Sequence, residues 1–255
     1  MSNPRQLQQL VQDAMDSILV AHDRERVRQL FHRDFVQHNP WAEDGGAHVE
    51  AMCDFGFGVR MSCWAVQGDI VAYHGLYTAP NPLGDHPLVC VDLWRVQGGQ
   101  IVEHWDALQP MPAEQAEALV EGPGDGFAER SPARVAANAA AARRLLELGV
   151  NRRELAVIRD LVDAQLRAHG LDEGVSDGRA RYLDWVESAA PQVTVKRTVS
   201  SGELVFAQLL IESRGAERVV YDIFRFDSEG RVVELWRVAQ DRVALAEAAN
   251  PHPHF

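Results

Sequence analysis

The stretch from Val89 to Gln109 is VCVDLWRVQGGQIVEHWDALQ, two apolar, β-branched-rich runs separated by Gly98 and Gly99. Glycine adopts the positive φ angles of a tight primed turn at no steric cost. A Gly-Gly pair between two such runs therefore predicts a β-hairpin.

A second stretch, from Val219 to Gln240, repeats this pattern as VVYDIFRFDSEGRVVELWRVAQ. The recurring residues are Asp92, Arg95, Glu103, Trp105 and Gln109, which return as Asp222, Arg225, Glu234, Trp236 and Gln240. The sharpest difference is that His104 and Asp106 are replaced by Leu235 and Arg237. The repeat indicates one domain written twice.

The expected register assigns each side chain to a face of the hairpin. We expect Val96 to pair with Ile101, which places His104 opposite Leu93 and Asp106 opposite Val91. Side chains alternate across a strand. The expected Asp106 face is Val91, Leu93, Arg95, Val102, His104, Asp106 and Leu108, and the expected Trp face is Asp92, Trp94, Glu103 and Trp105. The second copy keeps the Trp face, so we expect chemistry on the Asp106 face and architecture on the Trp face.

A carboxylate among Val and Leu side chains is costly unless it is paired or neutral. Burial also raises its pKa into a range useful for proton transfer. The alternative is that Asp106 forms a satisfied ion pair with Arg95, since structural ion pairs also perturb pKa values. The spacing leaves both interpretations open.

Composition limits the class of protein. The chain has 255 residues, 46% of them hydrophobic and 24% charged, with a formal net charge of −12. These values are typical of a soluble globular protein and argue against nucleic acid or an anionic membrane as partners. There is no signal-peptide layout or membrane span. The cysteines Cys53, Cys63 and Cys90 show no CxxC spacing, which predicts reduced thiols in a cytoplasmic protein.

We expect two domains, residues 1–112 and residues 131–255, joined by a Pro- and Gly-rich linker at 113–130 that a short helix may interrupt. Each domain begins with a cap followed by proline, at Asn3-Pro4 and Ser131-Pro132. Helices come first and strands later, which predicts an α+β fold with helices packed on the concave face of a curved antiparallel sheet. In the second domain we expect a helix over 154–169. The C-terminal AsnProHisProHisPhe is typical of an irregular surface tail.

Several motifs resemble one known family. They are GlnHisAsnPro at 37–40 with AspGly at 44–45, GlyAspIleValAlaTyrHis at 68–74, and AspLeuTrpArgVal followed by GlyGlnIleValGluHisTrpAspAlaLeuGlnPro at 92–110. In this order and spacing they resemble the SnoaL-like group of the NTF2-like superfamily. The second half is similar in outline, but Gln208 replaces His74 and Arg237 replaces Asp106, which makes it a degenerate copy.

The resemblance implies a cone-shaped α+β barrel with a deep pocket. Family members include polyketide cyclases that close rings by intramolecular aldol condensation without metal or organic cofactor. Their pocket aspartate is a general acid/base, and Asp106 matches its position. Relatives often dimerise through their sheets, so the resemblance also implies an intramolecular pseudo-dimer of the two domains. The aromatic residues of the Trp face either form that packing surface or fill each domain's own core. Whether the chain pairs again as a homodimer is left open.

Candidate site residues follow from this picture. Asp106 is the expected proton-transfer group. His74 and His38 are candidates for the partner acid or base, because imidazole titrates near neutral pH, although each could be purely structural. The counterpart of His38, His169, favours a turn-fixing role. The candidate ligand-binding residues are Asn39, Trp41, Arg95 and His104. A site with two histidines and one carboxylate could hold iron, but no HxH or HxxxH pair lies within a regular element of the first domain, so we expect no metal.

The leading hypothesis is a cofactor-independent cyclase, isomerase or hydratase-type enzyme that acts on a small hydrophobic carbonyl compound in the first-domain pocket. The alternative is a non-catalytic small-molecule-binding or interaction module with the second domain as scaffold. The enzyme hypothesis predicts that Asp106 lines a cavity near a histidine. The binding hypothesis predicts that Asp106 is locked to Arg95.

Overall fold

The computed structural model describes residues 3–122, 131–171 and 175–255. The chain divides into two compact units. The first comprises residues 1–124 together with 243–255, and the second comprises residues 125–242. The expected second domain, residues 131–255, included the C-terminal segment, whereas the structure groups residues 243–255 with the first unit.

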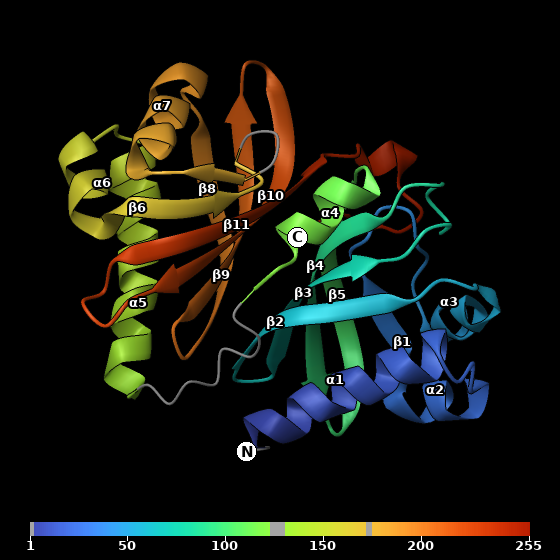
Figure 1. The fold of residues 1–255 in the computed structure, drawn as a ribbon. Helices are drawn as coiled ribbons and strands as arrows, with labels where there is room; N and C mark the ends of the chain where they lie inside the picture. The colour runs from blue at the N-terminus through green and yellow to red at the C-terminus, as the bar shows by residue number, and fades with distance from the viewer. Residues whose placement is uncertain (1–2, 123–130, 172–174) are drawn as a thin grey trace. The chain divides into compact units, whose positions relative to one another are not determined.

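The first unit begins with three helices interrupted by one strand and continues with an antiparallel meander (Figure 1). Its elements are α1 (Pro4–Leu19), α2 (Arg24–Leu30), β1 (Phe31–Gln37), α3 (Gly46–Ala51), the 3₁₀ turn η1 (Met52–Asp54), β2 (Val59–Gln67), β3 (Ile70–Tyr77), β4 (Leu88–Gln97), β5 (Gln100–Pro110), α4 (Ala113–Leu119) and the 3₁₀ turn η3 (Leu245–Glu247). Helix α4 lies at the start of the predicted linker, and the part of that linker at 123–130 lies outside the described residues.

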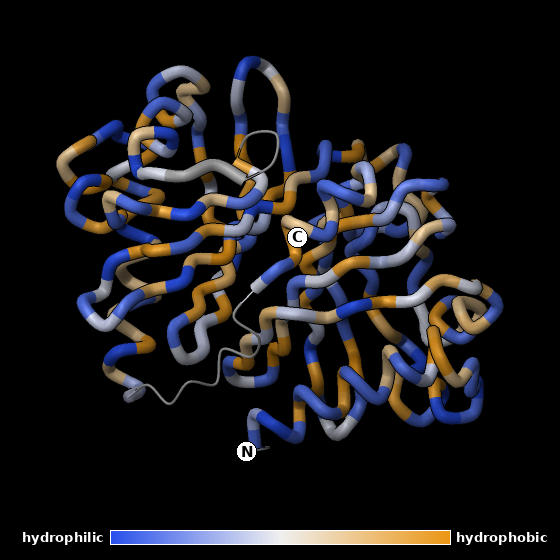
Figure 2. Tube along the Cα trace, viewed as in Figure 1, coloured by the Kyte–Doolittle hydropathy of each residue, from blue (hydrophilic) through white to orange (hydrophobic). Residues whose placement is uncertain are grey.

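Helix α1 starts at the predicted cap. The Asn3 side chain accepts a hydrogen bond from the Arg5 backbone N–H at 3.0 Å, and the Gln6 side chain accepts one from the Asn3 backbone N–H at 3.2 Å. This reciprocal arrangement is a capping box, which satisfies free N–H groups of the first turn. Apolar and polar residues alternate along the helix (Figure 2). Its buried side includes Val11 and Ile18, which places an apolar stripe against the sheet.

The first sheet has the strand order β1-β5-β4-β3-β2. Strand β1 runs parallel to β5, and the other neighbours are antiparallel. Helix α1 contacts β2 and β3, and α2 contacts β1 and β5. The unit is therefore α+β, with helices packed on one face of a mixed sheet.

The register of the hairpin differs from the prediction. Val96 does pair with Ile101, as expected, but a β-bulge follows, and Arg95 pairs with Glu103. Val102 is the extra residue. The pairing then continues with Trp94 opposite His104 and Asp92 opposite Asp106. A bulge inserts one residue into one strand only, so every later side chain changes its partner.

The bulge moves five residues to the face opposite the predicted one. Asp92 and Trp94 share the face of His104 and Asp106, whereas Val91, Leu93 and Arg95 lie on the opposite face with Glu103 and Trp105. The predicted division into an Asp106 face and a Trp face was therefore wrong on strand β4.

The second unit repeats the same plan. Its elements are α5 (Pro132–Arg144), the π-helical turn η2 (Leu145–Val150), α6 (Leu155–Leu161), β6 (Val162–His169), β7 (Val175–Asp177), α7 (Arg179–Ala189), β8 (Gln192–Ser201), β9 (Leu204–Ser213), β10 (Ala216–Phe226) and β11 (Val232–Asp241). The sheet order is β7-β6-β11-β10-β9-β8, with β6 parallel to β11. Apart from the edge strand β7, this is the order found in the first unit. The two units are tandem copies of one α+β fold.

The expected helix over 154–169 is correct only in its first half. The helix ends at Leu161, and residues Val162–His169 form strand β6. Side chains such as Ala, Gln, Leu and Arg favour a helix locally. Pairing with β11 overrides this preference, because it supplies backbone partners and buries Val162 and Leu166.

None of the described helices is long and apolar enough to cross a membrane.

Candidate active site

Asp106 lies on β5 and lines a cavity of about 180 Å³ in the first unit. The walls come from α1, β1, α3, β3, β4, β5 and the loops between them. The lining residues are Met15, Ile18, Phe35, Gln37, Asn39, Trp41, Ala42, His48, Val49, Met52, Phe55, Phe57, Tyr77, Asn81, Pro82, Leu83, Leu88, Trp94, His104, Asp106 and Leu108. Most of these side chains are apolar or aromatic, with a few polar groups, as is usual for a small-molecule site.

The carboxyl group of Asp106 is buried, with the residue only 3% exposed. Its Oδ2 accepts a hydrogen bond from Asn39 Nδ2 at 2.7 Å. Its Oδ1 has no hydrogen-bond partner among the described residues. One oxygen is thus held, and the other is available for proton transfer.

Burial raises the pKa of Asp106 to about 6, because the charged form loses its hydration. The neighbouring Asp92 charge also raises it, whereas His104 and the hydrogen bond from Asn39 lower it. A carboxyl group with this pKa exchanges protons readily near neutral pH.

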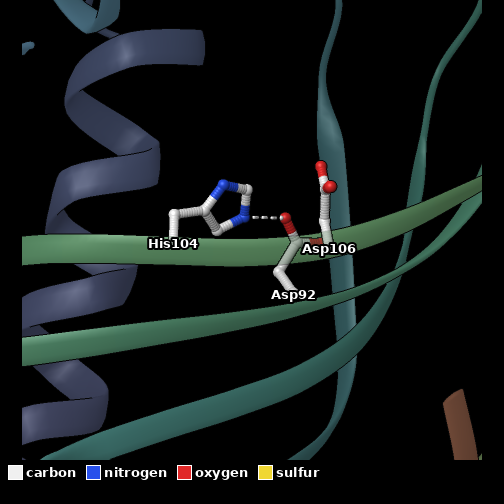
Figure 3. A group of neighbouring side chains, drawn as sticks. All are labelled: Asp92, His104 and Asp106. Carbon is white, nitrogen blue, oxygen red and sulfur yellow. Dashed lines mark hydrogen bonds and ion pairs between the residues drawn. The ribbon is translucent and has the colours of Figure 1, made fainter. Parts of the chain in front are cut away.

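Asp92 and His104 form a pair beside Asp106. His104 Nε2 lies 2.9 Å from Asp92 Oδ1, and the Tyr77 hydroxyl donates to the same oxygen at 3.1 Å. The Tyr77 hydroxyl is also 3.0 Å from the Tyr73 hydroxyl. Figure 3 shows Asp92, His104 and Asp106 on the same side of the sheet. The site therefore contains two carboxyl groups, of which one is already engaged by a histidine and a tyrosine.

The hydrogen bonds determine where the proton of His104 sits. The backbone N–H of Asn39 donates to Gln37 Oε1 at 2.9 Å, which identifies that atom as the amide oxygen. His104 Nδ1 lies 2.9 Å from the same oxygen and must therefore donate. Consequently one further proton lies between His104 Nε2 and Asp92 Oδ1. The imidazole is also stacked on Trp94, with 3.7 Å between ring centroids.

Asp92, His104 and Asp106 also offer ligand atoms within 4.8 Å of one another, which could hold a divalent metal ion. Such an ion would have to displace the proton between His104 and Asp92.

Of the residues predicted for the site, Asn39, Trp41 and His104 line the cavity with Asp106. Trp41 is 44% exposed and is thus the most exposed of these lining residues. His38, His74 and Arg95 are not among the lining residues.

His74 pairs with Val91 across β3 and β4 and therefore faces away from Asp106. His38 Nε2 lies 3.0 Å from Glu103 Oε1, and its ring stacks on Trp105. The structure does not bring either imidazole to the carboxyl group of Asp106.

The alternative in which Arg95 neutralises Asp106 is wrong. Arg95 Nε lies 3.1 Å from Glu103 Oε2, on the other face of the sheet. Its guanidinium lies over the ring of Trp105, 5.3 Å from the centroid. The second unit repeats this arrangement. There Glu234 Oε2 lies 2.7 Å from Arg225 Nη2, and Glu234 Oε1 lies 2.9 Å from His169 Nε2. The ring of His169 stacks on Trp236. A cluster that is present in both units fits a structural role.

In the second unit, an ion pair occupies the position that matches Asp106. Arg237, which replaces Asp106, donates from Nε and Nη2 to the two oxygens of Asp222 at 2.7 Å each. Its guanidinium lies 4.2 Å from the centroid of Trp185. Asp222 matches Asp92, so the same buried carboxyl group is balanced by a cation in one unit and faces a second acid in the other.

Three further residues belong to the candidate site, although the sequence pattern did not indicate them: Gln37, Tyr77 and Asp92. Asp92 has a visible signal, since it is an acid inside the apolar run VCVDLW. Its recurrence as Asp222 led to a structural interpretation instead. Tyr77 and Gln37 carry no local signal, because their roles depend on strand pairings.

By class, the protein is a tandem pair of α+β units, the first of which holds a buried acid in an apolar cavity. Residues 11–104 match the family model of the SnoaL-like domain. The matched segment ends just before Asp106.

Solved structures give further similarities. A candidate ketosteroid isomerase from Kribbella flavida is 18% identical over 43% of this chain and 82% of its own, with a TM-score of 0.39. IdmH, a candidate polyketide cyclase from Streptomyces antibioticus, is 19% identical over 43% and 96%, with a TM-score of 0.37. An LEH-like epoxide hydrolase from M. tuberculosis is 12% identical over 42% and 84%, with a TM-score of 0.36. No curated protein sequence matches the chain.

Proposed function

We propose that the first unit is a cofactor-independent SnoaL-like enzyme, of the cyclase, isomerase or hydratase type, that acts on a small hydrophobic carbonyl compound. Asp106 is its general acid/base. The observation that carries this proposal is the free Oδ1 of Asp106, buried in an apolar cavity on a carboxyl group whose pKa is raised to about 6.

The chemistry requires a base near the α-carbon of a carbonyl compound. Ionised Asp106 takes the α-proton as the C–H bond breaks, and the electron pair moves into the enolate. The protonated carboxyl group then returns the proton to carbon or to the oxygen of the new product. Hydrogen bonding to Asn39 orients the carboxyl group through both steps. Proton transfer of this kind needs no redox cofactor.

The cavity volume limits the ligand. A cavity of about 150 Å³ holds one benzene ring, so the 180 Å³ here suits one ring or a short branched chain. A larger compound would have to extend past Trp41 at the mouth.

The second unit serves in this proposal as a scaffold, without proton-transfer chemistry of its own. Asp222 has both oxygens bound by Arg237, and Leu235 replaces the histidine. An intramolecular pseudo-dimer of the two units, with a small hydrophobic ligand in the first, remains part of the proposal.

The test uses acetophenone, a one-ring ketone with exchangeable α-protons. In D₂O, the wild-type protein should replace the methyl protons by deuterium, which proton NMR measures directly. The rate should rise with pH through about 6 and then level off, because the ionised form of Asp106 is the base. Asp106→Asn should reduce the exchange at least about 100-fold, the usual contribution of general-base catalysis.

Asp184→Asn is the matched control, since this aspartate is exposed on α7 in the second unit. It should exchange acetophenone at the wild-type rate. Equal exchange by wild type and Asp106→Asn would overturn the enzyme proposal.

A binding module is the second candidate, favoured by the predominantly apolar cavity lining. It predicts that acetophenone binds to the wild type, seen as broadened ligand resonances, while α-proton exchange stays at the rate of buffer alone.

A further inference from the structure

We propose that the C-terminal segment, residues 243–255, is a positioning element for the proton-transfer group, and that Asn250 is its central residue. The segment holds the loop at 38–44 that carries Asn39, and Asn39 in turn holds Asp106. This inference rests on the proposed function for its catalytic meaning. Its structural content can be measured without turnover.

The segment binds the loop through backbone acceptors. Asn250 Nδ2 donates to the carbonyl oxygen of Asn39 at 2.6 Å and to that of Ala42 at 2.9 Å. The backbone N–H of Ala249 donates to the carbonyl oxygen of Pro40 at 2.7 Å, and that of His254 to the carbonyl oxygen of His38 at 2.7 Å. These bonds satisfy carbonyl groups of a loop whose own residues belong to no helix or strand.

Asn250 is held in one orientation. Its Oδ1 accepts from the backbone N–H of His252 at 2.9 Å, so its Nδ2 must be the group that faces the loop. The residue is only 5% exposed. His252 Nε2 adds an exposed contact to Asp44 Oδ2 at 3.0 Å, and His254 Nε2 accepts from the backbone N–H of Val243 at 2.9 Å. The segment is irregular after η3, as the sequence predicted, but it is a clamp on the loop rather than a surface tail, because Asn250 and His254 are buried.

Hydrogen bonds of Asn39 connect this loop to the candidate site. Asn39 donates to Asp106 from Nδ2, accepts from the Trp41 N–H at Oδ1 at 2.8 Å, and donates from its backbone to Gln37. Trp41 and Ala42 line the cavity mouth. Asn250 thus fixes the backbone of the residue whose side chain orients the carboxyl group.

The consequence is a change in the pKa of Asp106. Its hydrogen bond from Asn39 lowers that pKa, against burial, which raises it. If the clamp is lost, the loop moves more freely and the hydrogen bond weakens. The pKa of Asp106 should then rise above its value of about 6.

The second half of the chain carries this C-terminal segment, which belongs to the first unit. The clamp follows directly after β11, the last strand of the second unit. A chain that stops at the end of the first half would lack it.

The experiment follows the carboxyl carbon of Asp106 by NMR in full-length protein labelled with ¹³C-aspartate, assigned by its loss in Asp106→Asn. In Asn250→Ala, the titration midpoint should move upward from its wild-type value of about 6. The exposed Glu247, in the same segment, provides the control Glu247→Gln, which should titrate like wild type.

His252→Ala, a surface change, is the milder variant and should give a smaller shift in the same direction if Asn250→Ala does not fold. An unchanged midpoint in folded Asn250→Ala or, failing that, in His252→Ala overturns the proposal. If the midpoints shift as expected but even the wild type fails to exchange acetophenone, the positioning role stands and the proposed enzymatic function does not.

Discussion

Asp106 and Arg237 occupy the same place in two similar sheets, and the two side chains carry opposite charges when ionised. In the second unit the guanidinium of Arg237 binds both oxygens of Asp222. In the first, Asp106 cannot neutralise Asp92, which is engaged by His104 and Tyr77 instead. A buried carboxyl group without a cation is destabilising when it ionises. The first unit therefore keeps an unfavourable group in its cavity, which is typical of functional sites.

Replacement of this group should stabilise the protein in a defined pH range. The pKa of Asp106 is raised from 3.8 to about 6, which corresponds to about 3 kcal/mol. Between these values the unfolded state ionises before the native state, so the stability contributed by the neutral carboxyl group is lost as the pH rises through 6. Asp106→Asn should therefore be more stable than wild type at pH 7.5, by up to about 3 kcal/mol, and close to wild type below pH 4.

Urea denaturation of both proteins at the two pH values measures this difference. Asp184→Asn is again the control, since its carboxyl group is exposed. A difference between Asp106→Asn and wild type that does not depend on pH would contradict the assigned origin of the effect.

At the level of elements, the bulge at Val102 decides which residues meet. Without it, Asp106 would lie opposite Val91, and Asp92 would point away from the cavity. The second unit has a bulge at the matching place, where Arg225 pairs with Glu234 and Phe226 with Val232. Both copies have Val-Glu after the turn. The bulge is a repeated feature of the fold rather than an irregularity of one hairpin.

The residue that follows strand β6 differs between the two units in how it meets the neighbouring strand. His169 matches His38, and Gly170 follows it where the first unit has Asn39. Gly170 has a φ of +80°, and an added Cβ would collide with the backbone carbonyl oxygen of Arg237. In the second unit the backbone of Gly170 lies close to that of Arg237. At the matching place in the first unit, the Asn39 side chain holds Asp106.

Gly170→Ala should therefore destabilise the protein, by about 3 kcal/mol or more, because it adds a backbone collision to the cost of a positive φ. Gly215→Ala is the matched control: its φ is +81° and nothing lies within 4 Å of the added Cβ. It should cost only about 1 kcal/mol. Thermal denaturation of the two variants compares them, and equal losses would argue against the close approach at Arg237.

At the level of the whole molecule, the chain returns to its first unit after completing the second. The C-terminal segment therefore supports a unit that is far from it in sequence. The three cysteines all lie in the first half, and all are buried thiols that form no disulfide. Their reactivity reports on opening of the first unit, because the second half contains no cysteine.

A stop after Arg242 should lower the stability of the first unit. It removes several hydrogen bonds to the loop at 38–44, each contributing about 0.5–1.5 kcal/mol. Thiol modification by a chromogenic disulfide reagent, followed along a urea gradient, should have its midpoint at lower urea than in wild type. Glu247→Gln should leave the midpoint unchanged. Truncation without any shift in thiol exposure would show that the segment does not stabilise the first unit.

The sequence alone determined the tandem repeat, the α+β class, the hairpin with its Gly-Gly turn, the capped first helix and the difference between the two copies at position 106. These features depend on local chemistry: turn residues, caps, and an acid within an apolar strand that its copy lacks.

Only the tertiary structure decided which residues surround Asp106. Gln37, Tyr77 and Asp92 come from three different strands, and their meeting depends on a bulge and on pairings between distant segments. The same holds for β6, where pairing overrode helical preference, and for Asn250, whose contacts with the loop span most of the chain. Contacts between residues far apart in sequence depend on the register of the whole sheet, and periodicity within one segment carries no information about that register.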